Sequence, residues 1–309
     1  MNILTPCFND WQSLEYLIAD FEKVSKKLNI PFSIYVVNDG STIPMEFDPA
    51  KFETQVNIIH LNLNVGHQKA ISIGICYLSQ QEEKLDTIIM DSDGEDKPED
   101  VEYLIEYAKQ QPETVIFAQR KKRSEGIIFR TFYIVYKQIF KVLTGKHIGF
   151  GNFSLIPFSK LNNLANLSEI WNHYSGAVVK SRVQYDYVSV DRGKRYKGES
   201  KMNFISLVLH GISAISVHVE SVLVRLVVFS TFLFFALLVL VFVSLIMKFI
   251  FHLTSPGWTT TIIFGSLSLI FQLVFTSLLL CFQVLTIKNQ PAANPLENFK
   301  RYIKTVDKF

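Results

Sequence analysis

The first 120 residues alternate between short apolar runs and longer amphipathic stretches. The longer stretches, residues 11–28, 67–79 and 98–110, carry apolar positions at the three-to-four-residue spacing of helices. The last of them opens with Pro98 and Glu99, which are favoured in a first helical turn. This alternation predicts an α/β domain with a mostly parallel sheet. The short runs expected as its strands are residues 3–5, 33–37, 56–61, 87–90 and 114–118.

The C-terminal third contains two long stretches without a charged residue. Residues 226–247 form the first. At about 1.5 Å per residue a helix of this length spans roughly 33 Å, enough to cross a hydrocarbon core of about 30 Å. Residues 258–287 form the second. Because a helix in a soluble core would not stay apolar on every face for this long, we expect two transmembrane helices.

Basic residues flank the two apolar stretches on their outer sides, and only Lys248 lies in the link between them. The positive-inside rule therefore places both outer ends in the cytoplasm and makes the chain a multi-pass protein of the cell (inner) membrane. We expect four parts: a cytosolic domain (1–201), a juxtamembrane segment (202–220), a transmembrane hairpin (221–288) and a cytosolic basic tail (289–309). The flanking residues are Arg192, Lys194, Arg195, Lys197, Lys201 and Arg225 before the first stretch, and Lys288, Lys300, Arg301, Lys304 and Lys308 after the second.

Two further segments mix apolar residues with polar or basic ones. Residues 202–220 are apolar but interrupted by Asn, Ser, His and Gly, which favours an amphipathic helix in the membrane interface over a third span. A plain linker helix is the alternative for this segment. In residues 127–143, Arg130, Lys137 and Lys141 would meet lipid headgroups, or the helix would pack on the domain core.

Composition narrows the class of protein. Hydrophobic residues make up 49% and charged residues 19%, which is too apolar for an ordinary soluble domain and far from a disordered chain. The net charge of +3 lacks the clustered excess by which nucleic-acid binders neutralise phosphates, so we expect no nucleic-acid partner. Cys7, Cys76 and Cys281 are too widely spaced to indicate a disulfide framework or a zinc site. The N-terminus has no charged segment followed by an apolar one, so no secretory signal is expected.

Polar motifs follow four of the predicted strands, where a parallel sheet binds its ligands. They lie at residues 5–10, 37–42, 62–70 and 89–98, and taken singly each is also typical of an ordinary turn or helix start. The fourth is distinctive because Asp91, Asp93, Glu95 and Asp96 place four acids within six residues. Carboxylates are the ligands of hard divalent cations, which offset the charge of a nucleotide diphosphate. The spacing excludes an EF-hand, and a solvated acidic turn is the alternative.

In their order along the chain, these motifs resemble those of family 2 glycosyltransferases with the GT-A fold. Residues 6–10 (Pro-Cys-Phe-Asn-Asp) resemble the family's Pro-x-Tyr-Asn-Glu, residues 38–41 its Asp-Asp-Gly-Ser, and residues 64–70 its Asn-x-Gly-x-x-x-Ala. Asp91-Ser92-Asp93 resembles its metal-binding Asp-x-Asp, and Gln119-Arg120 with Arg123 its Gly-x-Arg stretch. Residues 192–201 resemble the Arg-x-x-Gly-x-Ser-Lys end of the dolichol-phosphate-mannose synthase and bactoprenol glucosyltransferase branch, in which a two-helix anchor is also typical.

The resemblance implies roles for individual residues. Pro6, Phe8, Asp10 and Asp39 would hold the base and ribose, and Arg120, Arg195 and Lys201 would meet donor or acceptor phosphates, for which Arg and Lys are the usual partners. A basic stripe on anionic lipid is the alternative for residues 192–201. The implied nucleotide-sugar-binding set is Pro6, Phe8, Asp10, Asp39, Asp91, Ser92 and Arg120. The implied ligands of Mg²⁺ or Mn²⁺ are Asp91, Asp93 and Glu95. The implied catalytic set is Asp93, Asn152, Arg195 and Lys201.

Some positions depart from the family pattern. Phe8 and Asp10 are mild changes, and Asn38 replaces the first Asp of its motif. Asn152 stands where relatives carry the Asp proposed as catalytic base, and an amide takes no proton at neutral pH. A phosphate monoester, with a second pKa of about 6, is already largely an anion at pH 7 and needs no base. Asn152 therefore favours a phosphate acceptor or altered activity. His173 lies nearby in sequence, and we expect it to be structural.

The leading hypothesis is an inverting glycosyltransferase that moves a sugar from a nucleotide diphosphate sugar, with UDP-hexose as the expected donor, to polyprenyl phosphate at the cytoplasmic membrane face. The partners are then the donor, the lipid acceptor and the bilayer, and the resemblance is compatible with a homo-oligomer. The alternatives are transfer to a hydroxyl of a lipid-linked saccharide or other glycan, and a pseudoenzyme that binds a nucleotide sugar. The sugar itself is not encoded in a readable motif, because small changes in pocket shape decide it.

Overall fold

The computed structural model describes the chain of 309 residues except 121–126, 147–148, 150, 198–203 and 290–293. The chain separates into two compact units, each with its own internal contacts. The first unit comprises Met1–Gln138, Lys146–Val217 and Ala292–Phe309, and the second comprises Ile139–Gly145 and His218–Pro291.

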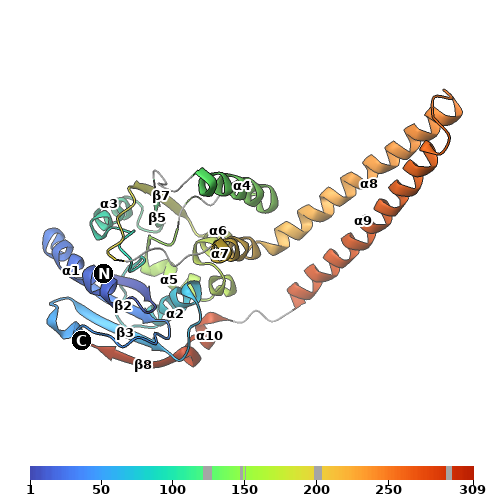
Figure 1. The fold of residues 1–309 in the computed structure, drawn as a ribbon. Coiled ribbons are helices and arrows are strands. Elements are labelled where there is room, and N and C mark those ends of the chain that lie inside the picture. Colours follow the sequence, from blue (N-terminus) through green and yellow to red (C-terminus); the bar gives the residue numbers. More distant parts are fainter. Residues whose placement is uncertain (121–126, 147–148, 150, 198–203, 290–293) are drawn as a thin grey trace. The chain divides into compact units, whose positions relative to one another are not determined.

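The first unit is built on a mixed sheet whose described strands are eight in number, in the order β7-β5-β6-β4-β1-β2-β3-β8 (Figure 1). β1 pairs in parallel with β2 and β4, β2 with β3, and β5 with β7. β6 is antiparallel to β4 and β5, and β8 is antiparallel to β3. The strands are β1 Asn2–Cys7, β2 Ser33–Asn38, β3 Gln55–Leu61, β4 Thr87–Ile89, β5 Val115–Arg120, β6 Ser154–Ile156, β7 Tyr185–Val190 and β8 Ile303–Lys308.

Helices lie on both faces of this sheet. α1 Trp11–Leu28 and α3 Val101–Gln110 cover one face, and α2 His67–Ser79, α5 Phe158–Ala165 and α6 Tyr174–Ser181 cover the other. The chain also forms the helices α4 Ile127–Thr144, α7 Phe204–Ser216 and α10 Pro295–Asn298. Short 3-10 turns occur at η1 Pro49–Lys51, η2 Pro98–Asp100, η3 Ser168–Trp171 and η4 Phe299–Tyr302.

Successive residues of the central strands point to opposite faces and so build two cores. Ile3 and Ile58 pack with α1 and α3 on one face. Leu4 and Ile59, their sequence neighbours, pack with α2, α5 and α6 on the other. This three-layer arrangement confirms the predicted α/β class, and strands buried on both faces explain the uninterrupted apolar runs in the sequence.

The predicted elements of the first 120 residues are confirmed with small shifts at their ends. The helices expected at residues 11–28 and 67–79 have those bounds, and the one expected at 98–110 begins with the turn η2 before α3. The expected strands are each present, displaced by up to two residues at an end. Helices also form in the two amphipathic segments, as α4 and α7.

Most of the segment expected as a cytosolic basic tail, residues 289–309, is folded. Residues 294–309, which we call the C-terminal segment, form α10, η4 and β8, and β8 pairs with β3 as an edge strand of the sheet. Phe299 is 1% exposed in the core that α2 shares. Strand pairing between residues more than 240 positions apart leaves no local pattern in the sequence. A short strand that carries several charged residues, such as β8, resembles a polar tail in composition.

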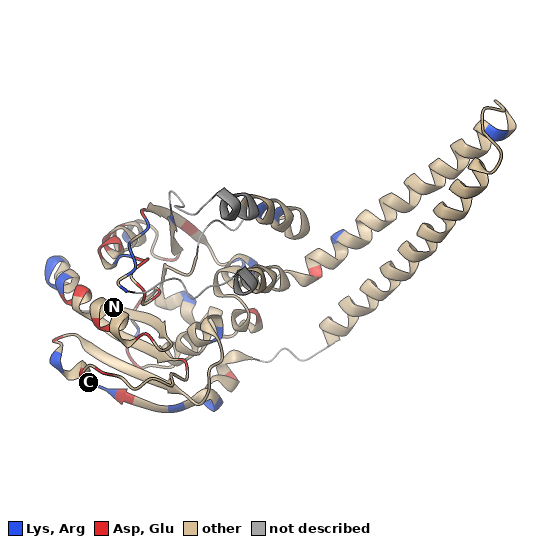
Figure 2. Ribbon diagram, viewed as in Figure 1, with Lys and Arg blue, Asp and Glu red and all other residues tan. Residues whose placement is uncertain are grey.

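The second unit contains two long antiparallel helices, α8 Val219–Phe249 and α9 Trp258–Asn289. Among the described residues these two are long and apolar enough to span a membrane, and few of their side chains are buried. Figure 2 shows both helices almost free of Lys, Arg, Asp and Glu along their length. Their composition therefore agrees with the two spans expected from the sequence, which α8 extends toward the N-terminus by one to two turns.

Candidate active site

The loops after β1 and β2 are joined by the side chain of Asn9. Its Oδ1 accepts hydrogen bonds from the backbone N–H groups of Thr42 (2.8 Å) and Ile43 (3.0 Å). Its own N–H donates to Ser41 Oγ at 2.9 Å. Asn9 has a φ of 52°, a left-handed conformation that asparagine tolerates better than most residues. These bonds fix the two loops at the carboxyl edge of the sheet.

The Asp39 carboxylate holds the loop between β3 and α2. Its Oδ1 accepts from the Val65 N–H at 2.7 Å and its Oδ2 from the Gly66 N–H at 3.0 Å. Burial raises the pKa of Asp39, and these two backbone bonds oppose the shift because they favour the charged form. Asp39 thus orders the loop that leads into α2, a role that the sequence pattern alone did not reveal.

The residues that follow β4, 91–96, form what we call the acidic loop. Asp91 Oδ1 is shielded from solvent and, among the described residues, accepts no hydrogen bond, although it lies 3.3 Å from His67 Nε2. Burial raises the pKa of Asp91 well above its usual range, and the charges of Asp96 and Asp93 raise it further. Burial also raises the pKa of Asp93, against the opposing effects of the Glu95 N–H and Arg195. The loop therefore concentrates carboxyl groups that a cation would stabilise in their charged form.

Arginines from distant parts of the chain surround the acidic loop. Glu95 accepts hydrogen bonds from Arg120 (3.2 Å), Arg192 (2.8 Å) and Arg195 (3.3 Å). Arg195 also donates to Asp93 Oδ2 at 2.6 Å, and Arg120 to Asp96 at 2.9 Å. Burial by itself would raise the pKa of Glu95, but the hydrogen bond and charge of Arg192, with Arg120 and Arg195, outweigh it and lower the pKa. The predicted acids and the predicted phosphate-binding arginines thus meet in one cluster.

Residues 192–197, which we call the basic segment, lie directly on the acidic loop. The Gly193 N–H donates to the Glu95 carbonyl at 2.8 Å, and the Tyr196 N–H donates to the Asp93 carbonyl at 2.9 Å. A Cβ on Gly193 would lie 2.3 Å from the Gly94 carbonyl oxygen, so the two backbones approach more closely than any side chain would allow. This contact explains why glycine stands at position 193.

Asn152 lies at the N-terminus of α2. Its Nδ2 is 3.0 Å from His67 Nε2, and its Oδ1 accepts from Gln68 Nε2 at 3.2 Å. Gln68 Oε1 in turn accepts from the Tyr174 N–H at 2.7 Å. His67 therefore links the acidic loop to the position of the missing base. Sequence reasoning did not select His67 or Gln68, although both follow Gly66 in the motif at residues 62–70.

Pro6 lies near the end of β1, Phe8 and Asp10 lie between β1 and α1, and His173 lies just before α6. Pro6 is buried, and its carbonyl accepts from Ser92 Oγ at 3.3 Å, while Phe8 is 41% exposed. Asp10 precedes α1 without capping it. His173 is buried and caps α6, where its Nδ1 accepts from the Gly176 N–H at 3.1 Å, as expected for a structural histidine. Lys201 and Arg123 lie outside the described residues.

One observation supports a divalent cation at the acidic loop: Asp91 Oδ1, beside Asp93, is shielded from solvent and accepts no hydrogen bond from the described residues. Among the described residues, no three His, Cys, Asp or Glu side chains already form a metal site. Mg²⁺ is commonly held by one or two carboxylates together with substrate phosphates rather than by a complete protein cage. Asp91 and Asp93 would hold the cation in a site of that kind, and binding would loosen the hydrogen bond between Arg195 and Asp93.

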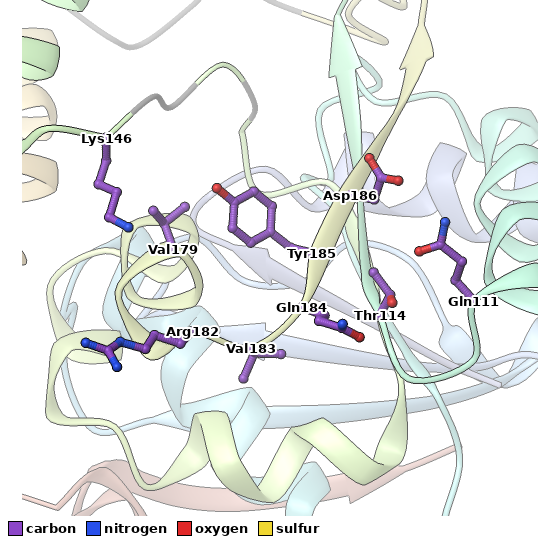
Figure 3. Close-up of a pocket in the computed structure, with 9 residues that line it drawn as sticks. All are labelled: Gln111, Thr114, Lys146, Val179, Arg182, Val183, Gln184, Tyr185 and Asp186. Carbon is purple, nitrogen blue, oxygen red and sulfur yellow. The ribbon is translucent and has the colours of Figure 1, made fainter.

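An open pocket of about 460 Å³ lies elsewhere in the first unit (Figure 3). Gln111 and Thr114, just before β5, and Gln184, just before β7, line it with Lys146, Arg182 and Tyr185. It therefore opens at the beginning of these strands, not at the carboxyl edge. No residue of the predicted site lines it, and we do not assign it to the active site.

The chain belongs to glycosyl transferase family 2, whose model matches residues 2–171, more than half of the sequence. It is 26% identical over 214 residues to an uncharacterized glycosyltransferase of Synechocystis sp., covering 67% of this chain and 65% of the relative. The uncharacterized glycosyltransferase YkcC of Bacillus subtilis is 23% identical over 290 residues, which cover 90% of this chain and 84% of YkcC. An undecaprenyl-phosphate 4-deoxy-4-formamido-L-arabinose transferase of Yersinia enterocolitica is 29% identical over 154 residues, 48% of this chain and 45% of that protein.

Solved structures of similar shape establish the fold. Glucosyl-3-phosphoglycerate synthase from Mycobacterium tuberculosis, in complex with Mn²⁺ and UDP-glucose, superposes with a TM-score of 0.53 at 12% identity, covering 72% of this chain and 78% of that chain. Mannosyl-3-phosphoglycerate synthase from Rubrobacter xylanophilus gives a TM-score of 0.51 at 13% identity, covering 70% and 71%. The first unit therefore has the GT-A fold that the sequence motifs predicted.

Proposed function

We propose that this protein is a membrane-anchored, inverting glycosyltransferase that transfers a sugar from a nucleotide diphosphate sugar to polyprenyl phosphate at the cytoplasmic face of the membrane. The observation that carries the proposal is the cluster at the carboxyl edge of the sheet, where the acidic loop meets Arg120, Arg192 and Arg195. Carboxylates that hold a cation and arginines that bind phosphate oxygens are the two kinds of group that a diphosphate requires.

In the donor complex, Asp91 and Asp93 would hold Mg²⁺ or Mn²⁺, whose charge would stabilise the departing nucleoside diphosphate. The arginines are paired with Glu95, Asp93 and Asp96 in the present structure, and each can exchange a carboxylate for a phosphate oxygen. Pro6, Phe8 and Asp10 are the proposed contacts of the base and ribose. Asp39 would act by holding the loop before α2 in place.

The acceptor phosphate would supply its own nucleophile. One of its oxygens attacks the anomeric carbon, the bond from that carbon to the diphosphate oxygen breaks, and the electron pair leaves with the nucleoside diphosphate. Since the second pKa of a phosphate monoester is about 6, this oxygen is already charged at pH 7. Asn152, held by His67 and Gln68, can donate a hydrogen bond but cannot remove a proton, which favours this acceptor over a sugar hydroxyl.

The course of the chain supports a membrane hairpin with both ends on one side. The chain leaves the first unit after α7, passes through α8 and α9, and returns to place β8 beside β3 in the same sheet. Strands of one sheet share a compartment, so the chain between them must cross a membrane an even number of times. The basic residues that flank both apolar helices favour the cytoplasm as that compartment.

The relatives agree with this proposal in part. The Yersinia relative is an undecaprenyl-phosphate 4-deoxy-4-formamido-L-arabinose transferase, and its similarity over 48% of this chain supports a polyprenyl phosphate acceptor. The mycobacterial neighbour was solved with Mn²⁺ and UDP-glucose, which supports a divalent cation and UDP as the nucleotide to test first.

The test is transfer of radiolabel to undecaprenyl phosphate by the full chain in detergent, with several UDP- and GDP-sugars and Mg²⁺ or Mn²⁺. A cation-dependent, acid-labile lipid product that Asp93→Asn abolishes is the expected result, and it names the donor at the same time. Nucleotide-sugar binding without a lipid product would overturn the acceptor. Glycans with free hydroxyls would then be the next acceptors, with Asn152→Asp as the variant to compare.

A further inference from the structure

The C-terminal segment gives β3 a neighbour on its outer side. β8 runs antiparallel to β3, with Asp307 opposite Ile58 and Thr305 opposite His60, and the register shifts between His60 and Leu61. The end of β3 therefore lies between β2 and β8. The loop that follows it, residues 62–66, is the loop that Asp39 holds.

A chain of side-chain contacts runs from β8 to the loop after β2. Asn38 Oδ1 accepts from the Ser41 N–H at 3.0 Å, so its amide nitrogen must face His60 Nδ1, 2.9 Å away. His60 Nδ1 is then the acceptor, which assigns the ring proton to Nε2. Nε2 lies 3.2 Å from Asp307 Oδ2. Asp307 thus orients His60, and His60 orients Asn38. Ser41, the last residue in this series of contacts, accepts a hydrogen bond from the Asn9 N–H.

A second set of contacts holds the loop before α2. The Asn62 N–H donates to the Tyr302 carbonyl at 2.9 Å, and the Asn62 side chain donates to the Arg301 carbonyl at 3.1 Å. At the other end of the loop, Lys69 Nζ donates to Tyr302 Oη at 2.9 Å. The same ammonium lies 4.2 Å from the centre of the Tyr302 ring and 4.9 Å from that of Trp171, within the range of cation–π attraction.

Lys69 follows directly on His67 and Gln68, the two residues that hold Asn152. The C-terminal segment therefore fixes three things at once: the loop after β2, the loop before α2 and the first turn of α2. All three lie at the carboxyl edge, where the donor would bind, yet no residue of the C-terminal segment contacts the acidic loop or the arginines in the described contacts.

We propose that the C-terminal segment completes the donor site, with Asp307 and Tyr302 as positioning residues that act through His60 and Lys69. This inference rests on the proposed function, because it takes the carboxyl edge to be the place where a nucleoside diphosphate binds. The chain reaches residue 294 only after passing through α8 and α9. Donor binding is then possible only once the chain beyond the second apolar helix has folded back onto β3.

The test measures binding of UDP and of GDP, each with Mn²⁺, to the full chain in detergent by titration calorimetry. Asp307→Ala and Tyr302→Phe each remove one contact, and a lost hydrogen bond of about 1 kcal/mol corresponds to a Kd raised about fivefold. Asp307→Asn keeps an oxygen that can accept from His60 and should bind like wild type. Lys304→Ala, an exposed position on the same strand, is the matched control and should leave the Kd unchanged.

The kinetic signature separates positioning from general destabilisation. Asp307→Ala and Tyr302→Phe should each raise the KM of the sugar donor by the same factor as the Kd of the nucleotide. Neither should change the KM of polyprenyl phosphate. Tyr302→Phe keeps the aromatic ring against Trp171, so it folds even where Asp307→Ala does not. If wild type binds the nucleotide, and Tyr302→Phe and folded Asp307→Ala bind it equally well, this inference is overturned but the proposed function is not. Absence of nucleotide binding in wild type would instead overturn the proposed function on which it rests.

Discussion

Replacing Gly193 with alanine is expected to separate the basic segment from the acidic loop. The added Cβ would lie 2.3 Å from the Gly94 carbonyl oxygen and 3.1 Å from the Glu95 carbonyl oxygen. Both are backbone atoms that cannot turn aside as a flexible side chain would. The φ of Gly193 lies outside the left-handed region, so alanine brings a steric clash without backbone strain. Relief of the clash requires the segment to move off the loop.

Two backbone hydrogen bonds depend on this close approach, from Gly193 to Glu95 (2.8 Å) and from Tyr196 to Asp93 (2.9 Å). At about 0.5–1.5 kcal/mol each, their loss amounts to about 1–3 kcal/mol. If the whole of this free energy is lost from binding of the transition state, kcat/KM falls roughly 5- to 150-fold. The fall follows because Arg192 and Arg195, which flank Gly193, would no longer lie at Glu95 and Asp93.

The assay is transfer to undecaprenyl phosphate under the conditions that support wild-type activity, with the thermal unfolding midpoint measured alongside. Gly265→Ala is the matched control, since a Cβ at that position would meet no atom within 4 Å. We expect kcat/KM to fall for Gly193→Ala and to hold for Gly265→Ala. Wild-type kcat/KM in a folded Gly193→Ala protein would refute the idea that the basic segment must contact the acidic loop.

Three further outcomes follow from the site. His67→Ala removes the contacts to Asn152 and Asp91 and should lower kcat/KM about tenfold with little change in the unfolding midpoint, whereas unaltered kinetics would exclude His67 from the site. EDTA should abolish transfer and Mn²⁺ restore it; full activity in chelator would show that the acidic loop holds no required cation. Burial raises the pKa of Asp100 to about 6. Between about pH 4 and pH 6 the folded protein therefore keeps a proton on Asp100 that the unfolded chain releases. The free energy of unfolding falls as the pH rises through this range. Asp100→Asn should therefore raise the unfolding midpoint at pH 7 but not at pH 3.5, and equal shifts at both pH values would contradict this.

Much of the site was predictable because its residues follow strands in sequence. Asp91 and Asp93 come directly after β4, and Asn38 and Asp39 end or follow β2, so their place at the carboxyl edge required only the strand assignment. Arg120 ends β5 and was expected to meet phosphates. The structure gives it carboxylate partners in Glu95 and Asp96, which the chemistry of an arginine allows but does not specify.

Other parts of the site carried no readable signal. His67 and Gln68 gain their meaning from Asn152, which lies 84 or more residues further along the chain. The role of Asp39 depends on backbone N–H groups of the next loop, and such bonds leave no trace in residue type. The short strand β6 and the short helices α5 and α6 are too brief for a periodic pattern to emerge.

By itself the sequence determined the features that depend on neighbouring residues: the helices at residues 11–28 and 67–79, the buried strands, the two long apolar helices and the motifs at strand ends. Periodicity and the length of an apolar stretch are local properties, because the residues that form the buried face of a helix lie three or four positions apart in the sequence. The tertiary structure alone decided that β8 joins β3, that Arg195 meets Asp93 and that His67 meets Asn152. Such pairings arise when packing brings distant segments together, and their free energy depends on distance in space, which no local pattern of residues records.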